Sequence, residues 1–245
     1  MTDQSLNTKE QNDPAGAWPL EARGRVHVVI AAYNESACVE DVVRRVRGCY
    51  PHVVVVDDGS QDDTADRALA GGAVVLRHPL NRGQGAAIQT GIDFALSRGA
   101  AYIVTFDSDG QHCVEDIERL VGPIHRGEAD IVLGSRFLGE AIDISWRRHL
   151  LLKGGVLFTR LMSGARVTDV HNGLRAFSRR AAGRIRITLD RMAHASELID
   201  LVHKCGLPYR EVPVRILYTD YSRAKGQRGL ASIRIVLHYL LGRIS

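Results

Sequence analysis

Short apolar runs alternate with helical segments through the first 133 residues, and this alternation constrains the fold more than any other feature of the sequence. The runs expected to form strands are rich in Val, Ile and Ala, and they span residues 25–32, 53–56, 73–77, 101–106 and 131–133. Between them, apolar residues recur at helical spacing in residues 36–47, 62–70, 85–97 and 114–120. Such alternation predicts an α/β protein with a doubly wound, mostly parallel sheet flanked by helices.

The second half of the chain is less regular. Helices are expected at residues 154–163, 196–205 and 230–244, and strands at residues 176–178 and 209–217. The sequence contains no internal repeat and no low-complexity linker, so we expect a single domain over residues 25–228. The polar residues 1–24 are predicted to form a disordered tail, and residues 229–245 an amphipathic C-terminal helix.

Composition excludes several classes of protein. Of the 245 residues, 45% are hydrophobic and 24% are charged, which is typical of a soluble globular protein. No run of about 18 uncharged apolar residues occurs, so no bilayer-spanning helix is expected, and the polar N-terminus lacks the apolar stretch of a secretory signal. The four cysteines form no CxxC pair, which argues against a zinc site and for a reducing, cytoplasmic compartment.

Charge is distributed unevenly along the chain. Residues 1–122 hold 11 basic and 18 acidic residues, whereas residues 123–245 hold 21 basic and 10 acidic ones. Nearly all of the basic residues are arginines, whose guanidinium group binds phosphate in a bidentate manner. The second half therefore favours a phosphate or a membrane surface as its partner.

Polar residues follow three of the predicted strands. They are Asn34 and Glu35 after the first strand, Asp57 and Asp58 after the second, and Asp107 and Asp109 after the fourth. Ligands of doubly wound sheets bind outside the carboxyl ends of the strands. We therefore expect these side chains to meet at one ligand-binding edge.

The segment TFDSDGQH at residues 105–112 carries the sharpest signal. A divalent cation such as Mg²⁺ or Mn²⁺ takes a few protein oxygens together with phosphate oxygens of a substrate. Asp109 and the side-chain amide of Gln111 would supply such oxygens, whereas His112 is expected to be a bystander.

Two further segments favour a nucleotide ligand. Asp57 and Asp58 have no basic partner within their own segment, and a carboxylate at a strand end can accept from a base N–H or a ribose hydroxyl. The glycines of residues 81–87, NRGQGAA, would let the backbone approach a phosphate or nucleoside. Because Ile88 stands where a dinucleotide fingerprint has its third glycine, a dehydrogenase is excluded.

Together these motifs resemble those of the family-2 glycosyltransferases, which have the GT-A fold. The resemblance spans residues 25–225, and the matching stretches are residues 32–35 (AYNE), 56–64, 81–87, 106–112 and 134–137 (GSRF). Within the family, the glutamine of DSDGQ, the GSRF stretch and residues 169–177 (DVHNGLRAF) are similar to the polyprenyl-phosphate sugar synthases of the dolichol-phosphate mannose or glucose type. The resemblance implies a cytosol-facing, inverting, metal-dependent hexosyltransferase that moves a sugar from a GDP- or UDP-sugar to a polyprenyl phosphate.

The resemblance also implies a role for individual residues. The nucleotide-sugar would be bound by Tyr33, Asn34, Glu35, Asp57, Asp58, Gly85, Asp107 and Lys225. The metal, Mg²⁺ or Mn²⁺, would be held by Asp107, Asp109 and Gln111. The phosphate of the donor or the lipid acceptor would be bound or supported by Arg136, Arg148 and Arg175. Asp109 and Arg136 would then stabilise the charge on the leaving diphosphate.

Three departures from the family pattern bear on the acceptor and donor. Ala31 and Ala32 stand where the first motif usually opens with proline, Gln84 replaces a common lysine, and residues 171–172 (His-Asn) replace a usual Thr-Ser. The last departure leaves the acceptor open, so a sugar hydroxyl in cell-surface polysaccharide or glycolipid synthesis is the alternative. A hydroxyl acceptor requires a general base, for which Glu197 is the first candidate and Asp169 the second.

Two other classes of protein fit the sequence less well. A sugar-nucleotide pyrophosphorylase would have a Gly-rich loop with Arg directly after its first strand, where this chain has AYNE. A nucleic-acid-binding protein would interleave aromatic residues with its basic ones, but only 6% of the residues are aromatic, so no nucleic-acid partner is expected. Residues 230–244 would pack on their own domain, pack on a second subunit of a homo-oligomer, or lie in a membrane interface.

Overall fold

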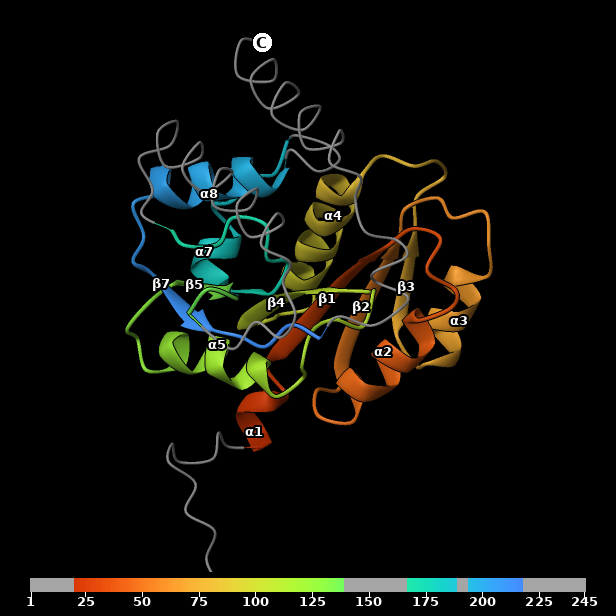
Figure 1. The fold of residues 1–245 in the computed structure, drawn as a ribbon, viewed down its shortest axis with the longest axis horizontal. Coiled ribbons are helices and arrows are strands. Elements are labelled where there is room, and N and C mark those ends of the chain that lie inside the picture. The colour runs from red at the N-terminus through yellow and green to blue at the C-terminus, as the bar shows by residue number, and fades with distance from the viewer. Residues whose placement is uncertain (1–19, 139–166, 189–193, 218–245) are drawn as a thin grey trace, which may run out of the picture.

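The computed structural model describes residues 20–138, 167–188 and 194–217. In this part of the chain, helices flank one sheet of seven strands (Figure 1). The strands are β1 (Val26–Ala32), β2 (His52–Asp57), β3 (Val74–Arg77), β4 (Tyr102–Asp107), β5 (Ile131–Ser135), β6 (Arg175–Ser178) and β7 (Tyr209–Pro213). The helices are α1 (Leu20–Arg23), α2 (Val39–Arg47), α3 (Thr64–Ala70), α4 (Gln84–Ser97), α5 (Asp116–His125), α7 (Arg179–Ala182) and α8 (His194–Lys204).

The strands lie in the order β3-β2-β1-β4-β6-β5-β7. Pairing is parallel from β3 through β4 and again between β5 and β7, which confirms the predicted mostly parallel sheet. Strand β6 is the exception, because it runs antiparallel to both β4 and β5. Its first residue, Arg175, therefore pairs with Thr105 and Leu133 near the carboxyl ends of those two strands.

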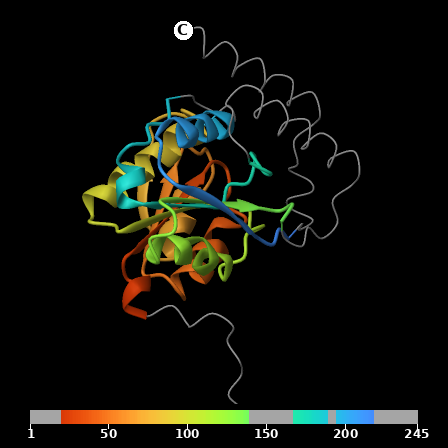
Figure 2. The ribbon, with the colours of Figure 1, turned by 90° about the vertical axis from the view of Figure 1, so that its left-hand side faces the viewer.

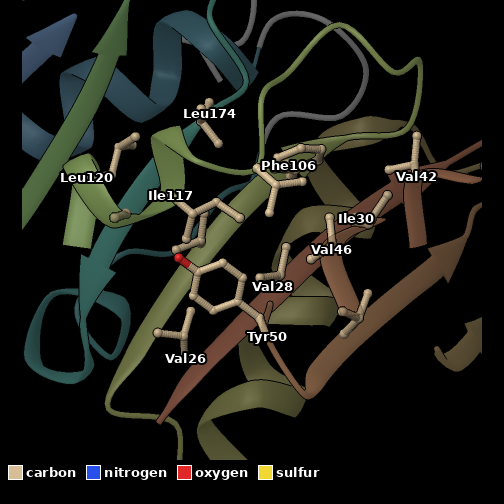
Figure 3. Packing of buried hydrophobic residues seen from close by; sticks show 14 of the residues in the cluster. Val26, Val28, Ile30, Val42, Val46, Tyr50, Phe106, Ile117, Leu120 and Leu174 are labelled. Carbon is tan, nitrogen blue, oxygen red and sulfur yellow. The ribbon is translucent and has the colours of Figure 1, made fainter. Parts of the chain in front are cut away.

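Apolar side chains cover both faces of the sheet. Along β1, Val28 and Ile30 belong to one hydrophobic layer and Val29 to the other, as the alternating pleat of a strand requires. The first layer packs against α2 and α5, and Figure 3 shows Val28 and Ile30 among their neighbours there. The second layer contains residues of α4, α7 and α8. Figures 1 and 2 show α4 and α8 on one face and α2 and α5 on the other.

Helix α4 lies close to the centre of the sheet because its interior contains a glycine. A Cβ on Gly91 would overlap the side chain of Val29 in β1, so a larger residue would push the helix away. The apolar face of α4, including Ile88 and Ile92, is buried in the second layer. This packing places the first turn of α4 beside the carboxyl ends of β1 and β2.

Several predicted elements have different ends in the structure. The helix expected from residue 36 begins at Val39, and the N–H of Ser36 before it is donated to Asp62 Oδ2, at 3.2 Å. The strand expected over residues 209–217 ends at Pro213, which has no N–H to donate, and Ile216 then forms an isolated bridge with His112. Residues 20–23, which we expected within the tail, form α1, and Ala22 is buried in the first layer.

The helices predicted at residues 154–163 and 230–244 lie outside the described residues. Among the helices that the structure describes, none has both the length and the apolar character needed to cross a bilayer.

Candidate active site

The first two loops at the carboxyl edge of the sheet are tied together by side-chain hydrogen bonds. Asn34, which has a left-handed φ of 53°, donates its N–H to Ser60 Oγ at 2.9 Å and accepts from the N–H of Gln61 at 3.0 Å. The N–H of Glu35 is donated to Thr64 Oγ1 at 2.8 Å. Asn34 and Glu35 therefore hold the loop after β1 against the loop after β2, and Tyr33 beside them is 41% exposed.

Asp62 reinforces this junction rather than capping α3 by itself. Its carboxylate accepts from the N–H of Ser36 and from both the N–H and the hydroxyl of Thr64. Burial would raise the pKa of Asp62, but these hydrogen bonds outweigh it and the net pKa is lowered. The carboxylate is thus kept ionised as a structural acceptor.

Asp57 and Asp58 are both buried at the end of β2 and just after it, and their basic partners are the last residue of β3 and the residue that follows it. Oδ1 of Asp57 accepts the N–H of Ser60 at 3.0 Å, and Oδ2 lies 3.2 Å from Nε of Arg77. Oδ1 of Asp58 lies 2.7 Å from Nδ1 of His78. The sequence alone did not reveal these two basic partners. Arg77 and His78 come close to the aspartates only through the parallel pairing of β2 with β3.

Asp107 is contacted by residues from three segments, two of which are distant from it in sequence. Oδ2 lies 2.9 Å from Nε2 of His112, and Oδ1 accepts from the side-chain amide of Gln84 at 3.4 Å. The backbone of Gly173 lies against the same carboxylate, since a Cβ at residue 173 would lie closer than 3.0 Å to both carboxylate oxygens. His112, expected to be a bystander, is 2% exposed and orients Asp107 directly.

Asp109 lies in a crowded, acidic environment. Burial raises the pKa of Asp109, and the nearby charges of Asp107 and Glu35 raise it further, although the N–H of Gln111 donates to Oδ1 at 3.0 Å. A cation would relieve this repulsion between carboxylates. The described residues contain no cluster of three or more His, Cys, Asp or Glu side chains suited to a metal. Asp107, Asp109 and Gln111 nevertheless fit a cation such as Mg²⁺, which takes only one or two carboxylates when phosphates complete its shell.

Two arginines are buried on the β5–β6 side of this edge. Nε and the backbone N–H of Arg136 both donate to Oδ2 of Asp169, at 2.7 and 3.1 Å. Burial lowers the pKa of Arg175 to about 10, although the charges of Asp107 and Asp169 act to raise it. The guanidinium group of Arg175 donates to the carbonyl of Val170 at 2.9 Å. The guanidinium group of Arg175 therefore remains positive at neutral pH and adds positive charge near Asp107.

Of the other predicted site residues, the structure describes Gly85 and Glu197. Gly85 is buried in the first turn of α4. Glu197 lies in the first turn of α8, where Oε1 accepts from the N–H and the hydroxyl of Thr188 at 2.8 and 2.5 Å. Arg148 and Lys225 lie outside the described residues.

The fold and this edge define the protein as a GT-A glycosyltransferase. Glucosyl-3-phosphoglycerate synthase from Mycobacterium tuberculosis has a similar solved structure, with a TM-score of 0.66 and 21% identity over 92% of this chain and 84% of that one. Residues 27–186 match the model of the family described as Glycosyl transferase family 2, and the chain belongs to this family.

Relatives of known sequence extend the comparison over nearly the whole chain. The uncharacterized protein MJ1222 of Methanocaldococcus jannaschii is 37% identical over 91% of this chain and 93% of its own. Polyprenol monophosphomannose synthase of Mycolicibacterium smegmatis is 33% identical over 82% of this chain and 80% of its own. UDP-N-acetylglucosamine–dolichyl-phosphate N-acetylglucosaminyltransferase of Methanococcus voltae is 30% identical, with coverage of 88% and 95%.

Proposed function

We propose that the protein transfers a hexose from a nucleoside-diphosphate sugar to a polyprenyl phosphate, with inversion and with Mg²⁺ or Mn²⁺. The names of two relatives support the lipid-phosphate acceptor, and another solved structure of the similar synthase contains Mn²⁺ and UDP-glucose. The observation that carries the proposal is the crowding of Asp107, Asp109 and Glu35 beside the buried Arg175. Such an edge suits a ligand that brings both a cation and a diphosphate.

In this proposal, the chain positions charges around the bond that breaks. An oxygen of the acceptor phosphate attacks the anomeric carbon, the bond from that carbon to the diphosphate breaks, and the nucleoside diphosphate leaves with the electron pair. Asp109, Asp107 and Gln111 would hold the metal, which when bound supplies positive charge for the leaving diphosphate. Arg136, oriented by Asp169, adds fixed positive charge that needs no reorganisation during the reaction.

The bonding of the two candidate bases favours a phosphate acceptor over a hydroxyl. A sugar hydroxyl needs a general base, whereas a lipid phosphate is already anionic. Asp169 is engaged by Arg136, and Glu197 accepts two hydrogen bonds from Thr188. Both carboxylates therefore have structural partners, which fits a reaction that requires no base.

Membrane contact belongs to the same proposal. A polyprenyl phosphate is held in a bilayer, so the enzyme would work as a peripheral protein at the cytoplasmic face. Residues 230–244 would then be the membrane contact, and the alternative is that they pack on their own domain or on a second subunit. Pelleting with anionic liposomes, before and after removal of these residues, distinguishes the two: equal pelleting would exclude the membrane role.

Direct assay of the purified protein tests the proposed function. GDP-mannose, UDP-glucose and UDP-N-acetylglucosamine would each be supplied with Mn²⁺ or Mg²⁺, in the presence or absence of a polyprenyl phosphate, and lipid products would be identified by mass spectrometry. We expect a glycosylated lipid phosphate from at least one donor, and none after EDTA. Transfer to a free sugar or glycolipid hydroxyl, with no lipid phosphate product, would favour the alternative acceptor.

A further inference from the structure

We infer that His78 is a positioning residue that acts through Asp58 on the turn at the start of α4. This inference rests on the proposed function, because it places the effect in donor binding. The side chain of His78 is 8% exposed and joins two elements. Its Nδ1 lies 2.7 Å from Oδ1 of Asp58, and its Nε2 lies 3.0 Å from Oγ1 of Thr90 in the second turn of α4.

Hydrogen bonds within the protein occupy most of the acceptor positions of the Asp58 carboxylate. Besides His78, it accepts the N–H of Arg82 at 3.0 Å and the N–H of Gly83 at 2.6 Å. An ionised carboxylate only accepts, so Nδ1 of His78 carries the proton in this contact. A carboxylate has about four acceptor positions, and three are taken by the protein, so one remains for a ligand. His78 fixes the direction in which that last position points.

The turn that Asp58 holds has little other support. Gly83 is the N-cap residue of α4 with a left-handed φ of 97°, and as a glycine it has no side chain of its own to cap the helix. Backbone N–H groups at a helix start have no partner within the helix, and here the carboxylate of Asp58 replaces that partner. Asp58 is itself fixed to the central sheet, because its N–H is donated to the carbonyl of Ala32 at 2.9 Å.

The turn leads directly to the acidic pair of the active site. Gln84 follows Gly83, and its side-chain amide donates to Oδ1 of Asp107 at 3.4 Å. A continuous set of contacts thus runs from Thr90 through His78 and Asp58 to Gln84 and Asp107. Loss of the imidazole would remove a charge-assisted hydrogen bond from a buried carboxylate and free the turn to move. We therefore expect His78 to govern how tightly the donor binds.

Three variants and a matched control test this role. His78→Leu removes both contacts, and His78→Asn keeps a donor for Asp58 but is too short to reach Thr90. Thr90→Val removes the second contact, together with the hydrogen bond that the Thr90 hydroxyl donates to the carbonyl of Ala86 at 3.0 Å. The control is His125→Asn, which removes an imidazole on α5 that is hydrogen bonded to Tyr102 of β4. Each variant would be measured by hydrogen exchange of the peptide containing Arg82 and Gly83, by the affinity for UDP and GDP with Mn²⁺, and by the donor KM and kcat.

We expect His78→Leu to accelerate exchange at Arg82 and Gly83 and to raise both the nucleotide Kd and the donor KM about tenfold. The acceptor KM should stay unchanged, His78→Asn should recover part of the affinity, and His125→Asn should match the parent protein. Unchanged exchange together with a Kd within twofold of the parent would overturn the inference, and so would a lower melting temperature with an unaltered donor KM.

The same measurements separate this inference from the proposed function. If His78→Leu does not fold, His78→Asn and Thr90→Val decide by the same criteria. If the parent protein binds neither UDP nor GDP, the proposed function fails, whereas exchange at Arg82 and Gly83 still shows whether His78 holds the turn.

Discussion

The backbone of Gly173 lies directly against the carboxylate of Asp107, at a distance that no side chain on residue 173 would permit. The carbonyl of Gly173 also accepts the hydroxyl of Thr105 at 2.6 Å, which fixes the segment before β6 to the end of β4. Asp107 can therefore keep its contacts with His112 and Gln84 only while residue 173 is glycine.

We predict that Gly173→Ala displaces Asp107 and lowers kcat/KM about a hundredfold, the usual order of effect for a catalytic group moved by about 1 Å. Overpacking should also cost about 1–3 kcal/mol in the free energy of unfolding. Gly183→Ala is the control, because a Cβ there would meet its nearest atom, the carbonyl of Arg179, at an ordinary 3.4 Å. Parent-like activity of Gly173→Ala would show that Asp107 does not need its present orientation.

Asp109→Asn should separate catalysis from stability. We predict a loss of at least about a hundredfold in metal-dependent kcat/KM, because the variant lacks the charge that holds the cation beside the diphosphate. The melting temperature should not fall, since burial and Asp107 already raise the pKa of Asp109 and so disfavour its charged form. Asp66→Asn, an exposed change on α3, is the control, and full metal-dependent turnover by Asp109→Asn would contradict the proposed metal site.

The Arg136–Asp169 pair should affect stability far more than an exposed pair of the same chemistry. The two side chains are 8% and 1% exposed, whereas those of Arg186 and Asp93 are 61% and 49% exposed. Arg136→Ala leaves a buried carboxylate without its partner and should cost about 3–5 kcal/mol, but Arg186→Ala should cost less than about 1 kcal/mol. Urea denaturation measures both values.

A double variant tests the same argument. Replacing Arg136 with Met and Asp169 with Leu removes both charges, so part of the stability lost in Arg136→Ala should return. Transferase activity should stay low, because the fixed positive charge is absent. Equal instability of the single and double variants would mean that packing, not the stranded charge of Asp169, causes the loss.

Local patterns were sufficient to predict the strands and the acidic edge. The β-branched run of β2 and the carboxylates directly after it lie in one short segment, and the parallel register then aligns Ala31 with Asp107 and Ala32 with Asp57. Once strand–helix alternation indicates a parallel sheet, the gathering of Glu35, Asp57 and Asp107 at one edge follows.

Contacts between distant segments were not predictable in this way. No local pattern reveals that β6 inserts antiparallel between β4 and β5, which is what carries Arg175 and Gly173 to Asp107. His78 and Arg77 were missed as partners of the two aspartates for the same reason, since a separation of 20 residues between Asp58 and His78 carries no signal at either position.

His27 should make stability depend on pH in a range where most carboxylates are already ionised. The residue is 6% exposed, its ring stacks on that of His52 with centroids 4.5 Å apart, and its Nδ1 has no hydrogen-bond partner in the described residues. Burial, aided by the charge of His52, lowers the pKa of His27 from 6.5 to about 4. The unfolded chain therefore binds the proton more readily than the folded one between these two values.

Stability from this group is fully present above pH 6.5 and is lost as the pH falls toward 4. The loss should be on the order of 3 kcal/mol, measured as the free energy of unfolding in urea at several pH values between 7.5 and 4. His27→Phe keeps a ring beside His52 without a titrating nitrogen, so its stability should fall less over the same range. His203→Gln, an exposed change on α8, is the control and should keep the pH dependence of the parent. If the free energy of unfolding of His27→Phe falls as much as that of the parent over this range, the pH dependence belongs to other groups.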